Sequence, residues 1–402
     1  MQVIHNFCTK SNCADGSYAH STLTMDAAGN LFGVAMTGGK AGDGLVFELV
    51  PNENKTEWTY KILHDFCLRD CSDGRNPVGT VAVGTAGNIY GVSSQLQTSN
   101  AGLAYMLYPV DNGAWRARTI YEFCSGGDCP VGYFPNTGLS FAGMGPGVLY
   151  DGMSPLFGTT IGADGTAYEI YPKRRSWHGR LISNFRETGH YGYRPQGGIL
   201  VDASGTAYGT TWSGGNYVDG VVFESVPTSK GWKYRPLHQF DGDHGAGPRG
   251  SLAMDAAGNL YGTTSTGDGS ASKGVLYKLV PQNGQSQFSV LYDFCHVGPK
   301  CADGADAEDG PMVDGFGNLF GTTAQGGNYD SNYLGSGILY EFEQSTHTFQ
   351  VVYDFCSEPN CTDGETPESG LIMDSSGDIF GTTTSGGAAG AGVVFELTPA
   401  AP

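Results

Sequence analysis

Short apolar stretches alternate with turn-forming residues along the whole chain. Residues 252–254 (Leu-Ala-Met), for example, precede a turn that begins at Asp255 and contains Gly258, and the apolar segments 260–264 and 274–277 follow. Stretches of this length, rich in Val, Tyr, Phe and Thr and bounded by Gly, Pro and Asn, are typical of β-strands. No stretch sustains the 3.6-residue period of a surface helix. The pattern therefore predicts an all-β protein.

This succession of segments occurs seven times. Three marks recur in the same order: a glycine after an apolar or aromatic residue (Gly33, Gly91, Gly158, Gly209, Gly262, Gly321, Gly381), an aromatic residue further on (Phe47, Tyr105, Tyr168, Phe223, Tyr277, Tyr340, Phe395), and a Phe between units (Phe7, Phe66, Phe123, Phe185, Phe240, Phe294, Phe355). Each unit of about 55–60 residues contains four expected strands, and such a repeat is the signature of a propeller. We predict a seven-bladed β-propeller with four antiparallel strands per blade.

The two ends of the sequence predict how the ring closes. Residues 2–8 match the fourth strand of other units, such as residues 61–67, and the chain ends soon after a third strand. We therefore expect residues 1–8 to complete the blade formed by residues 366–399. No linker or change in composition interrupts the period, so residues 1–402 are expected to form a single propeller domain.

Ten cysteines form five close pairs, and every pair begins directly after the Phe that ends a unit. The alternatives are local disulfides and zinc binding. A zinc site needs four ligands, and each pair belongs to a different blade, so we expect five disulfides. Disulfides are typical of oxidising compartments, which predicts a secreted, extracellular or periplasmic protein. The pairs are Cys8 and Cys13, Cys67 and Cys71, Cys124 and Cys129, Cys295 and Cys301, and Cys356 and Cys361.

The charge balance excludes some partners. The net charge is −19 at pH 7, which disfavours the phosphates of nucleic acids and anionic membrane surfaces. No run of 18 or more apolar residues occurs, so we expect no membrane insertion. No apolar segment precedes the first expected strand, and we expect an export signal to have been removed. A monomer that binds a carbohydrate or another small polar ligand is the prediction.

The repeated Gly-Asn-Leu-Tyr-Gly-Thr-Thr phrase at residues 258–264, followed by Gly-Val-Leu-Tyr at 274–277, resembles the GloVer-type (Gloeo-Verruco) tandem repeat of secreted and surface bacterial proteins. More weakly, the hairpin is similar to those of NHL, gluconolactonase and streptogramin-lyase propellers. The resemblance implies that the first strand of each blade lines a central channel, with the loops before it opening on one face. It implies no activity, so the function has to be argued from the site.

Under that geometry, one position just before each inner strand faces the mouth of the channel and differs from blade to blade. We predict a catalytic group of Asp309, Glu368, His20 and Arg249, with Asn136 and Gln196 as substrate-binding residues and Val78 as the one apolar member. Two neighbouring carboxyls can act as acid and base when their surroundings separate their pKa values, as glycosidases require. The alternative is that Asp309 and Glu368 are solvated rim residues or partners of Arg249.

A second set of candidate residues lies on blades four and five, the two blades without cysteine pairs. Their entry loops carry His190, Tyr193 and His244 as further catalytic candidates, with Arg194 as a substrate-binding residue. Arg can neutralise a uronate carboxylate while Tyr or His moves a proton, which suits β-elimination from acidic sugars. The alternative is an aromatic loop that packs on its neighbour.

Further residues predict how a ligand would be held. Trp212, Tyr217 and Tyr329 lie on exits of second strands and could stack on sugar rings. The preferred function is a secreted carbohydrate-active enzyme, a glycoside hydrolase or polysaccharide lyase. The alternatives are a metal-dependent lactonase-like hydrolase, with Ca²⁺ or another divalent ion held by mouth residues, and a non-catalytic carbohydrate-binding or adhesion propeller. The Asp-x-x-Gly turns are interpreted as hairpin chemistry rather than as calcium sites.

Overall fold

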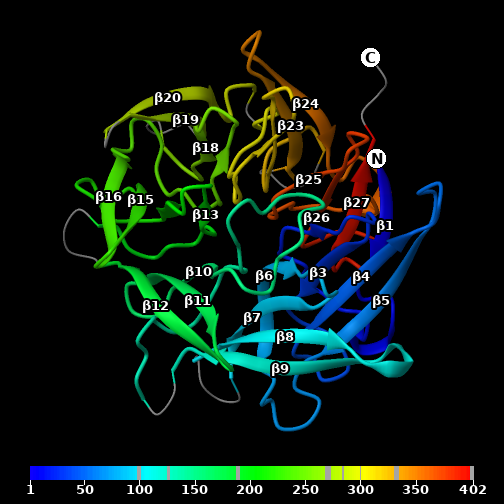
Figure 1. The fold of residues 1–402 in the computed structure, drawn as a ribbon. Coiled ribbons are helices and arrows are strands. Elements are labelled where there is room, and N and C mark those ends of the chain that lie inside the picture. Colours follow the sequence, from blue (N-terminus) through cyan, green and yellow to red (C-terminus); the bar gives the residue numbers. More distant parts are fainter. Residues whose placement is uncertain are drawn as a thin grey trace.

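The computed structural model describes residues 1–96, 101–124, 127–186, 191–267, 273–282, 285–298, 300–329 and 335–398. These residues form seven antiparallel sheets arranged as blades around a ring (Figure 1). Six sheets have four strands and one, in the third blade, has three among the described residues. The predicted all-β, seven-bladed propeller is confirmed.

The strands follow the chain from the inside of each blade outwards. Blade 1 contains β2 (Thr24–Met25), β3 (Leu31–Ala35), β4 (Leu45–Pro51) and β5 (Trp58–Asp65), and blade 2 contains β6 (Arg75–Val83), β7 (Ile89–Gln95), β8 (Leu103–Pro109) and β9 (Trp115–Glu122). Blade 3 contains β10 (Leu156–Thr160), β11 (Thr166–Lys173) and β12 (Ser176–Asn184), and blade 4 contains β13 (Leu200–Val201), β14 (Ala207–Thr211), β15 (Val221–Thr228) and β16 (Gly231–Gln239). Blade 5 contains β17 (Ala253–Met254), β18 (Leu260–Thr263), β19 (Val275–Gln282) and β20 (Gln285–Asp293), and blade 6 contains β21 (Met312–Val313), β22 (Leu319–Thr323), β23 (Ile338–Glu343) and β24 (Thr348–Asp354). Blade 7 contains β25 (Ile372–Met373), β26 (Ile379–Thr382) and β27 (Val393–Leu397), with β1 (Gln2–Asn6) on its outer edge.

The first strand closes the ring, as the sequence predicts. Strand β1 pairs with β27 in antiparallel register, with Val3 opposite Phe395 and Asn6 opposite Val393. Phe7, the residue after the strand, is fully buried against the core of blade 1. Figure 1 shows β1 and β27 side by side, at the point where the two ends of the colour gradient meet.

The repeated glycine and the repeated aromatic residue contact each other in the structure. In each blade the repeated glycine lies directly opposite the repeated aromatic residue, as Gly33 lies opposite Phe47 and Gly262 opposite Tyr277. A Cβ atom on Gly262 would come within 2.3 Å of the Tyr277 hydroxyl, and one on Gly33 within 2.6 Å of the Phe47 ring. The aromatic ring thus covers the bare glycine backbone, and any larger residue there would displace it.

Hydrogen bonds within each turn explain why the Asp-x-x-Gly phrase is repeated in the hairpins. In blade 5, Asp255 accepts hydrogen bonds at Oδ1 from the backbone amides of Ala257 and Asn259, both at 2.9 Å. Its second oxygen accepts from the Asn259 side chain at 2.7 Å. Such an Asx turn stabilises a tight hairpin, so the interpretation of these aspartates as turn residues is confirmed.

All five predicted disulfides are formed, each between cysteines four to six positions apart. The zinc alternative is therefore wrong. An aspartate two residues after the second cysteine completes four of the loops: Asp15, for example, accepts from the backbone amides of Thr9 at 3.0 Å and Lys10 at 3.2 Å. These four loops are thus fixed by a covalent bond and a carboxylate together.

Blade 3 departs from the repeat in a way that the sequence analysis missed. Between Phe141 and β10, residues 142–155 form a loop instead of a tight hairpin. The Gly147 amide donates to the carbonyl of Met25 at 3.1 Å, and the Tyr150 amide to that of Val83 at 2.7 Å. Figure 1 shows this loop in blue-green near the centre of the ring. It links blade 3 to blades 1 and 2 at the end of the ring where the hairpin turns lie.

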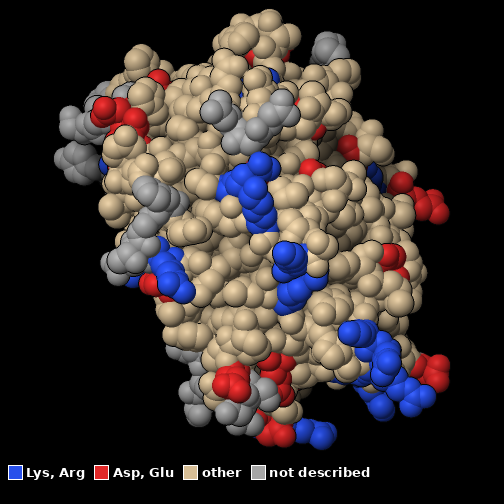
Figure 2. All heavy atoms as spheres, turned by 60° about the vertical axis from the view of Figure 1, so that its left-hand side comes forward, with Lys and Arg blue, Asp and Glu red and all other residues tan. Residues whose placement is uncertain are grey.

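One flank of the ring carries few charges. Figure 2 shows the side formed by the outer strands on the left of Figure 1 as a largely uncharged surface with separate Lys and Arg groups.

Among the described residues, no helix has the length and apolar character needed to cross a membrane.

Candidate functional site

The face of the ring from which the inner strands begin carries a central hollow of about 260 Å³. All seven blades contribute to its wall through the segments that enter their inner strands. Met144, from the loop of blade 3, also lines it. The predicted set largely comes together there: the hollow is lined by His20, Asn136, Gln196, Arg249, Asp309 and Glu368. Val78 instead packs against the core, and Gly79 and Thr80 represent blade 2 in the wall.

The alignment of blade 6 was wrong by one residue. Arg249 and Glu368 each lie three positions before the buried leucine of their inner segment, and in blade 6 that position is Glu308, not Asp309. The misalignment arose because Pro311 replaces the leucine in that blade. Glu308 lines the hollow and forms an ion pair with the Arg249 guanidinium of blade 5. It is the functional candidate that the sequence reasoning missed.

Asp309 serves the backbone instead. Its Oδ1 accepts hydrogen bonds from the amides of Ser251 at 2.9 Å and Gly310 at 2.8 Å, and its Oδ2 accepts from the Thr22 hydroxyl at 3.1 Å. These partners lie on blades 5, 6 and 1, so the carboxylate ties three blades together inside the ring. A carboxylate with both oxygens engaged in this way is a structural group.

Glu308 is electrostatically unusual. Its side chain is only 17% exposed, and burial raises its pKa from 4.5 to about 7, against the opposing effect of Arg249 and with further increases from Asp306 and Glu368. Removing a carboxylate from water disfavours its charged form, and nearby negative charge acts in the same direction. Glu308 can therefore hold or release a proton near neutral pH.

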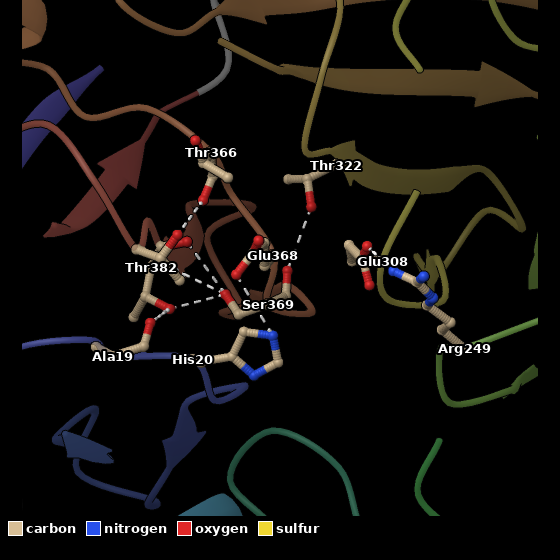
Figure 3. Close-up of polar contacts among 10 residues, drawn as sticks. Ala19, His20, Arg249, Glu308, Thr322, Thr366, Glu368, Ser369 and Thr382 are labelled. Carbon is tan, nitrogen blue, oxygen red and sulfur yellow. Dashed lines mark hydrogen bonds and ion pairs between the residues drawn. The ribbon is translucent and has the colours of Figure 1, made fainter. Parts of the chain in front are cut away.

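Glu368, on the neighbouring blade 7, has a different partner. His20 Nε2 lies 3.6 Å from a Glu368 carboxylate oxygen, and the His20 ring stacks near Tyr18. Burial, and then the charge of Glu368, raise the pKa of Tyr18. Figure 3 shows His20 and Glu368 pointing toward each other, while Arg249 meets Glu308 to the right of them.

A network of hydroxyl groups holds the segment that carries Glu368. The Ser369 hydroxyl donates to the carbonyl of Thr382 at 3.2 Å, and the Thr382 hydroxyl donates to the carbonyl of Ala19 at 3.0 Å (Figure 3). Thr322 of blade 6 donates to the carbonyl of Ser369 at 3.3 Å. These bonds connect blades 6, 7 and 1, so the Glu368 and His20 backbones are fixed relative to one another.

The two amide candidates differ in how far they are engaged. Asn136 donates to the carbonyl of Pro195 at 3.2 Å and accepts from the Thr159 hydroxyl at 3.3 Å, so it bridges blades 3 and 4. Gln196 lines the hollow beside it. Asn136 is a positioning residue, whereas Gln196 remains a candidate for contact with a ligand.

The second predicted set does not reach the hollow. His190 lies outside the described residues. Tyr193 is half-buried against the core of blade 4, and His244 is exposed with its Nδ1 3.2 Å from Asp241. Neither residue lines the hollow.

The aromatic candidates fall into two groups. Tyr217 and Tyr329 are exposed by 60% and 49% and do not line the hollow. Trp212 is half-buried beside its rim, and its ring lies 5.5 Å from the Arg249 guanidinium carbon and 5.7 Å from that of Arg194. Cation–π contacts of this kind hold the guanidinium groups in place.

The mouth residues do not fit a divalent ion. Both Asp309 oxygens and the Asn136 amide are engaged by protein groups. Among the described His, Cys, Asp and Glu side chains, the groups of three close enough to share an ion each contain a disulfide-bonded cysteine pair. Disulfide sulfur is not the thiolate that binds metal. We therefore derive no metal-dependent chemistry for this site.

The Gloeobacter/Verrucomicrobia repeat family matches residues 147–395, more than half of the chain. The chain belongs to this repeat family. The resemblance inferred from the Gly-Asn-Leu-Tyr-Gly-Thr-Thr phrase is thus confirmed for the repeat. No protein of curated function matches the sequence.

One solved structure supports the fold of this member of the repeat family. A candidate 6-phosphogluconolactonase from Bacteroides fragilis superposes with a TM-score of 0.52 at 13% identity, over 91% of this chain and 96% of that protein. PorZ, a surface component of the type-IX secretion system of Porphyromonas gingivalis, superposes with a TM-score of 0.47 at 12% identity, over 94% of this chain and 50% of PorZ. At such identity the first likeness concerns the propeller fold alone, and the second carries no argument.

Proposed function

We propose that this protein is a carbohydrate-active enzyme that hydrolyses a glycosidic bond in the central hollow. The observation that carries the proposal is the pair Glu308 and Glu368: both line one hollow, and burial holds the pKa of Glu308 at about 7. Hydrolysis by two carboxyl groups needs one that is protonated and one that is ionised. The burial of Glu308 and the His20 contact of Glu368 support a division of roles between the two carboxyl groups.

The two residues take different roles in the reaction. Glu308, in its protonated form, donates its proton to the oxygen of the leaving alcohol as the glycosidic C–O bond breaks. Glu368, as a carboxylate, accepts a proton from the water whose oxygen forms the new bond to the anomeric carbon. His20 holds the Glu368 carboxylate from one side, and Arg249 orients Glu308.

Hydrolysis is better supported than β-elimination. The proton-moving residues expected for elimination, Tyr193 and His244, do not line the hollow, and His244 is engaged with Asp241. The size of the hollow supports a small substrate portion, because about 260 Å³ lies just below the usual range of small-molecule sites. A chain end or a short oligosaccharide suits this volume better than the middle of a polymer.

A second function, carbohydrate binding without cleavage, is supported by the two side-chain pairs at the mouth, whose members already contact each other. Arg249 already contacts Glu308, and His20 already contacts Glu368. A ligand could use these four groups as a fixed set of hydrogen-bond partners without any proton transfer.

A substrate panel separates the two functions. The protein is incubated with plant and microbial oligosaccharides, and new reducing ends and the absorbance of unsaturated uronates are followed together. We expect reducing ends without unsaturated products. Unsaturated products would favour elimination, and binding in affinity gels with neither signal would favour the non-catalytic function.

We further infer that the protein works outside the cytoplasm. Its five disulfides support this location, because such bonds persist in oxidising compartments. Alkylation of thiols in intact cells before lysis tests the inference: the native protein should take up no label, whereas labelled cysteines would indicate a reducing compartment.

A further inference from the structure

Two arginines share one indole ring beside the hollow: Arg249 lines the hollow, whereas Arg194 and Trp212 lie outside its lining. Arg249 belongs to the entry segment of blade 5, Arg194 to that of blade 4, and Trp212 follows β14 between them. Both guanidinium carbons lie within 6 Å of the Trp212 ring centre, at 5.5 Å and 5.7 Å. Gly247 also lies against the indole, because a Cβ atom there would come within 2.9 Å of the indole nitrogen. The indole is thus held in place and fixes two positive charges at one side of the mouth.

No carboxylate of the described residues forms an ion pair with Arg194. The Arg194 side chain is exposed. Two arginines on outer strands differ, because Arg180 pairs with Glu169 and Arg235 with Glu224. In a protein of net charge −19, an unpaired guanidinium held on an aromatic ring beside a hollow calls for an explanation.

Arg249 also has unused hydrogen-bonding capacity. One of its terminal nitrogens donates to Glu308, but its Nε is buried without a partner in the part of the chain that the structure describes. A guanidinium carries five donors, and its planar fork matches the two oxygens of an acidic group. A buried donor without a partner is unfavourable, and a ligand oxygen at this side of Arg249 would provide the missing acceptor.

We propose that the ligand of the hollow is an anionic sugar, whose acidic group binds between Arg249 and Arg194 beside Trp212. This inference rests on the proposed function for the sugar itself and adds the charge of the substrate. Gln196, two residues after Arg194, lines the adjoining wall and can donate to a sugar hydroxyl. The net negative charge of the protein repels anions at long range, so recognition depends on the direct contacts of these two arginines.

Binding of matched ligands tests the proposal. Tetragalacturonate and its methyl ester have the same sugar chain but differ in charge, and their binding to the full chain is measured by calorimetry. A sugar phosphate, glucose 6-phosphate, is compared with glucose to distinguish a phosphate from a carboxylate as the acidic group. We expect at least one acidic member to bind about tenfold more tightly than its neutral counterpart, the strength of a charge-assisted contact.

Variants locate the contact. Arg194→Gln removes an exposed charge and should weaken binding of the preferred acid about fivefold to tenfold without affecting the neutral ligand. Arg194→Lys should restore part of the affinity. Arg175→Gln, which removes an exposed charge from the outer turn between β11 and β12, is the matched control and should leave binding unchanged.

The outcomes separate this inference from the proposed function. Equal binding of acidic and neutral ligands, no binding of any of the four, or an Arg194→Gln variant equal to the control would each overturn it. Cleavage of a neutral oligosaccharide with no preference for acids would retain the hydrolase and remove the anionic substrate. Selective, Arg194-dependent binding without turnover of any sugar would retain the anionic site and remove the hydrolase.

Discussion

Arg249 of blade 5 forms an ion pair with Glu308 of blade 6 across the mouth of the propeller. The next residue, Asp309, turns to the backbone and binds the amides of Ser251 and Gly310. Two adjacent carboxylates thus have separate tasks, since one faces the hollow and the other holds the blades together. This division leads directly to different expectations for the two positions.

Asp309→Asn is expected to lower stability rather than to remove activity. The asparagine keeps one acceptor oxygen, but it loses the charge and places an amide group where a hydroxyl now donates. The loss of a charge-assisted hydrogen bond predicts about 1–3 kcal/mol less free energy of unfolding. Urea denaturation measures this change, with Asp243→Asn on an exposed loop as the control. Equal midpoints for the two variants would contradict the structural role.

The pH dependence of stability should reveal Glu308. Its pKa is raised on folding from 4.5 to about 7, so the folded protein binds this proton more tightly than the unfolded chain. The contribution is fully present below pH 4.5 and is lost as the pH rises through 7, a difference of about 3–4 kcal/mol. Comparing wild type with Glu308→Gln across this window isolates the effect. Parallel stability curves for the two proteins would show that the pKa is not raised.

The ring could be predicted from the sequence because the residues that define each blade lie close together in the chain and recur in every blade. The Gly262 and Tyr277 positions recur in every blade, and one packing contact enforces both. The site was harder to predict, because its residues differ between blades and only an alignment relates them. Pro311 disturbed that alignment by one position, which placed Asp309 where Glu308 lies. The loop that contributes Met144 has no counterpart in other blades, so the repeat carried no information about it.

Closure of the ring by β1 can be tested with two phenylalanines. Phe7 is fully buried where β1 meets blade 1, and Phe316 is 94% exposed in the turn between β21 and β22. Phe7→Ala should cost about 3–5 kcal/mol, as expected for a large cavity in a packed core. Phe316→Ala should change stability by no more than about 0.5 kcal/mol. Thermal denaturation of both variants measures the difference, and a Phe7→Ala protein as stable as Phe316→Ala would contradict closure.

A single disulfide loop should contribute modestly to stability. Replacing Cys356 and Cys361 together by serine removes a cross-link between residues five positions apart. Loop-closure entropy predicts a loss of about 2 kcal/mol, with the blade still folded because Asp363 continues to bind the Ser357 amide. Denaturant midpoints and far-ultraviolet circular dichroism measure both effects. Loss of the whole fold would show that the loop is needed for more than local order.

The most direct test of the central claim is the turnover of Glu308→Gln on the oligosaccharide that wild type cleaves best. The account predicts that kcat/KM falls at least about 100-fold, the usual contribution of a general acid. Glu53→Gln, a charge-matched change at an exposed position in the turn between β4 and β5, should retain full turnover. Glu308→Gln with unaltered turnover and an intact fold would contradict the assignment of the hollow as the catalytic site.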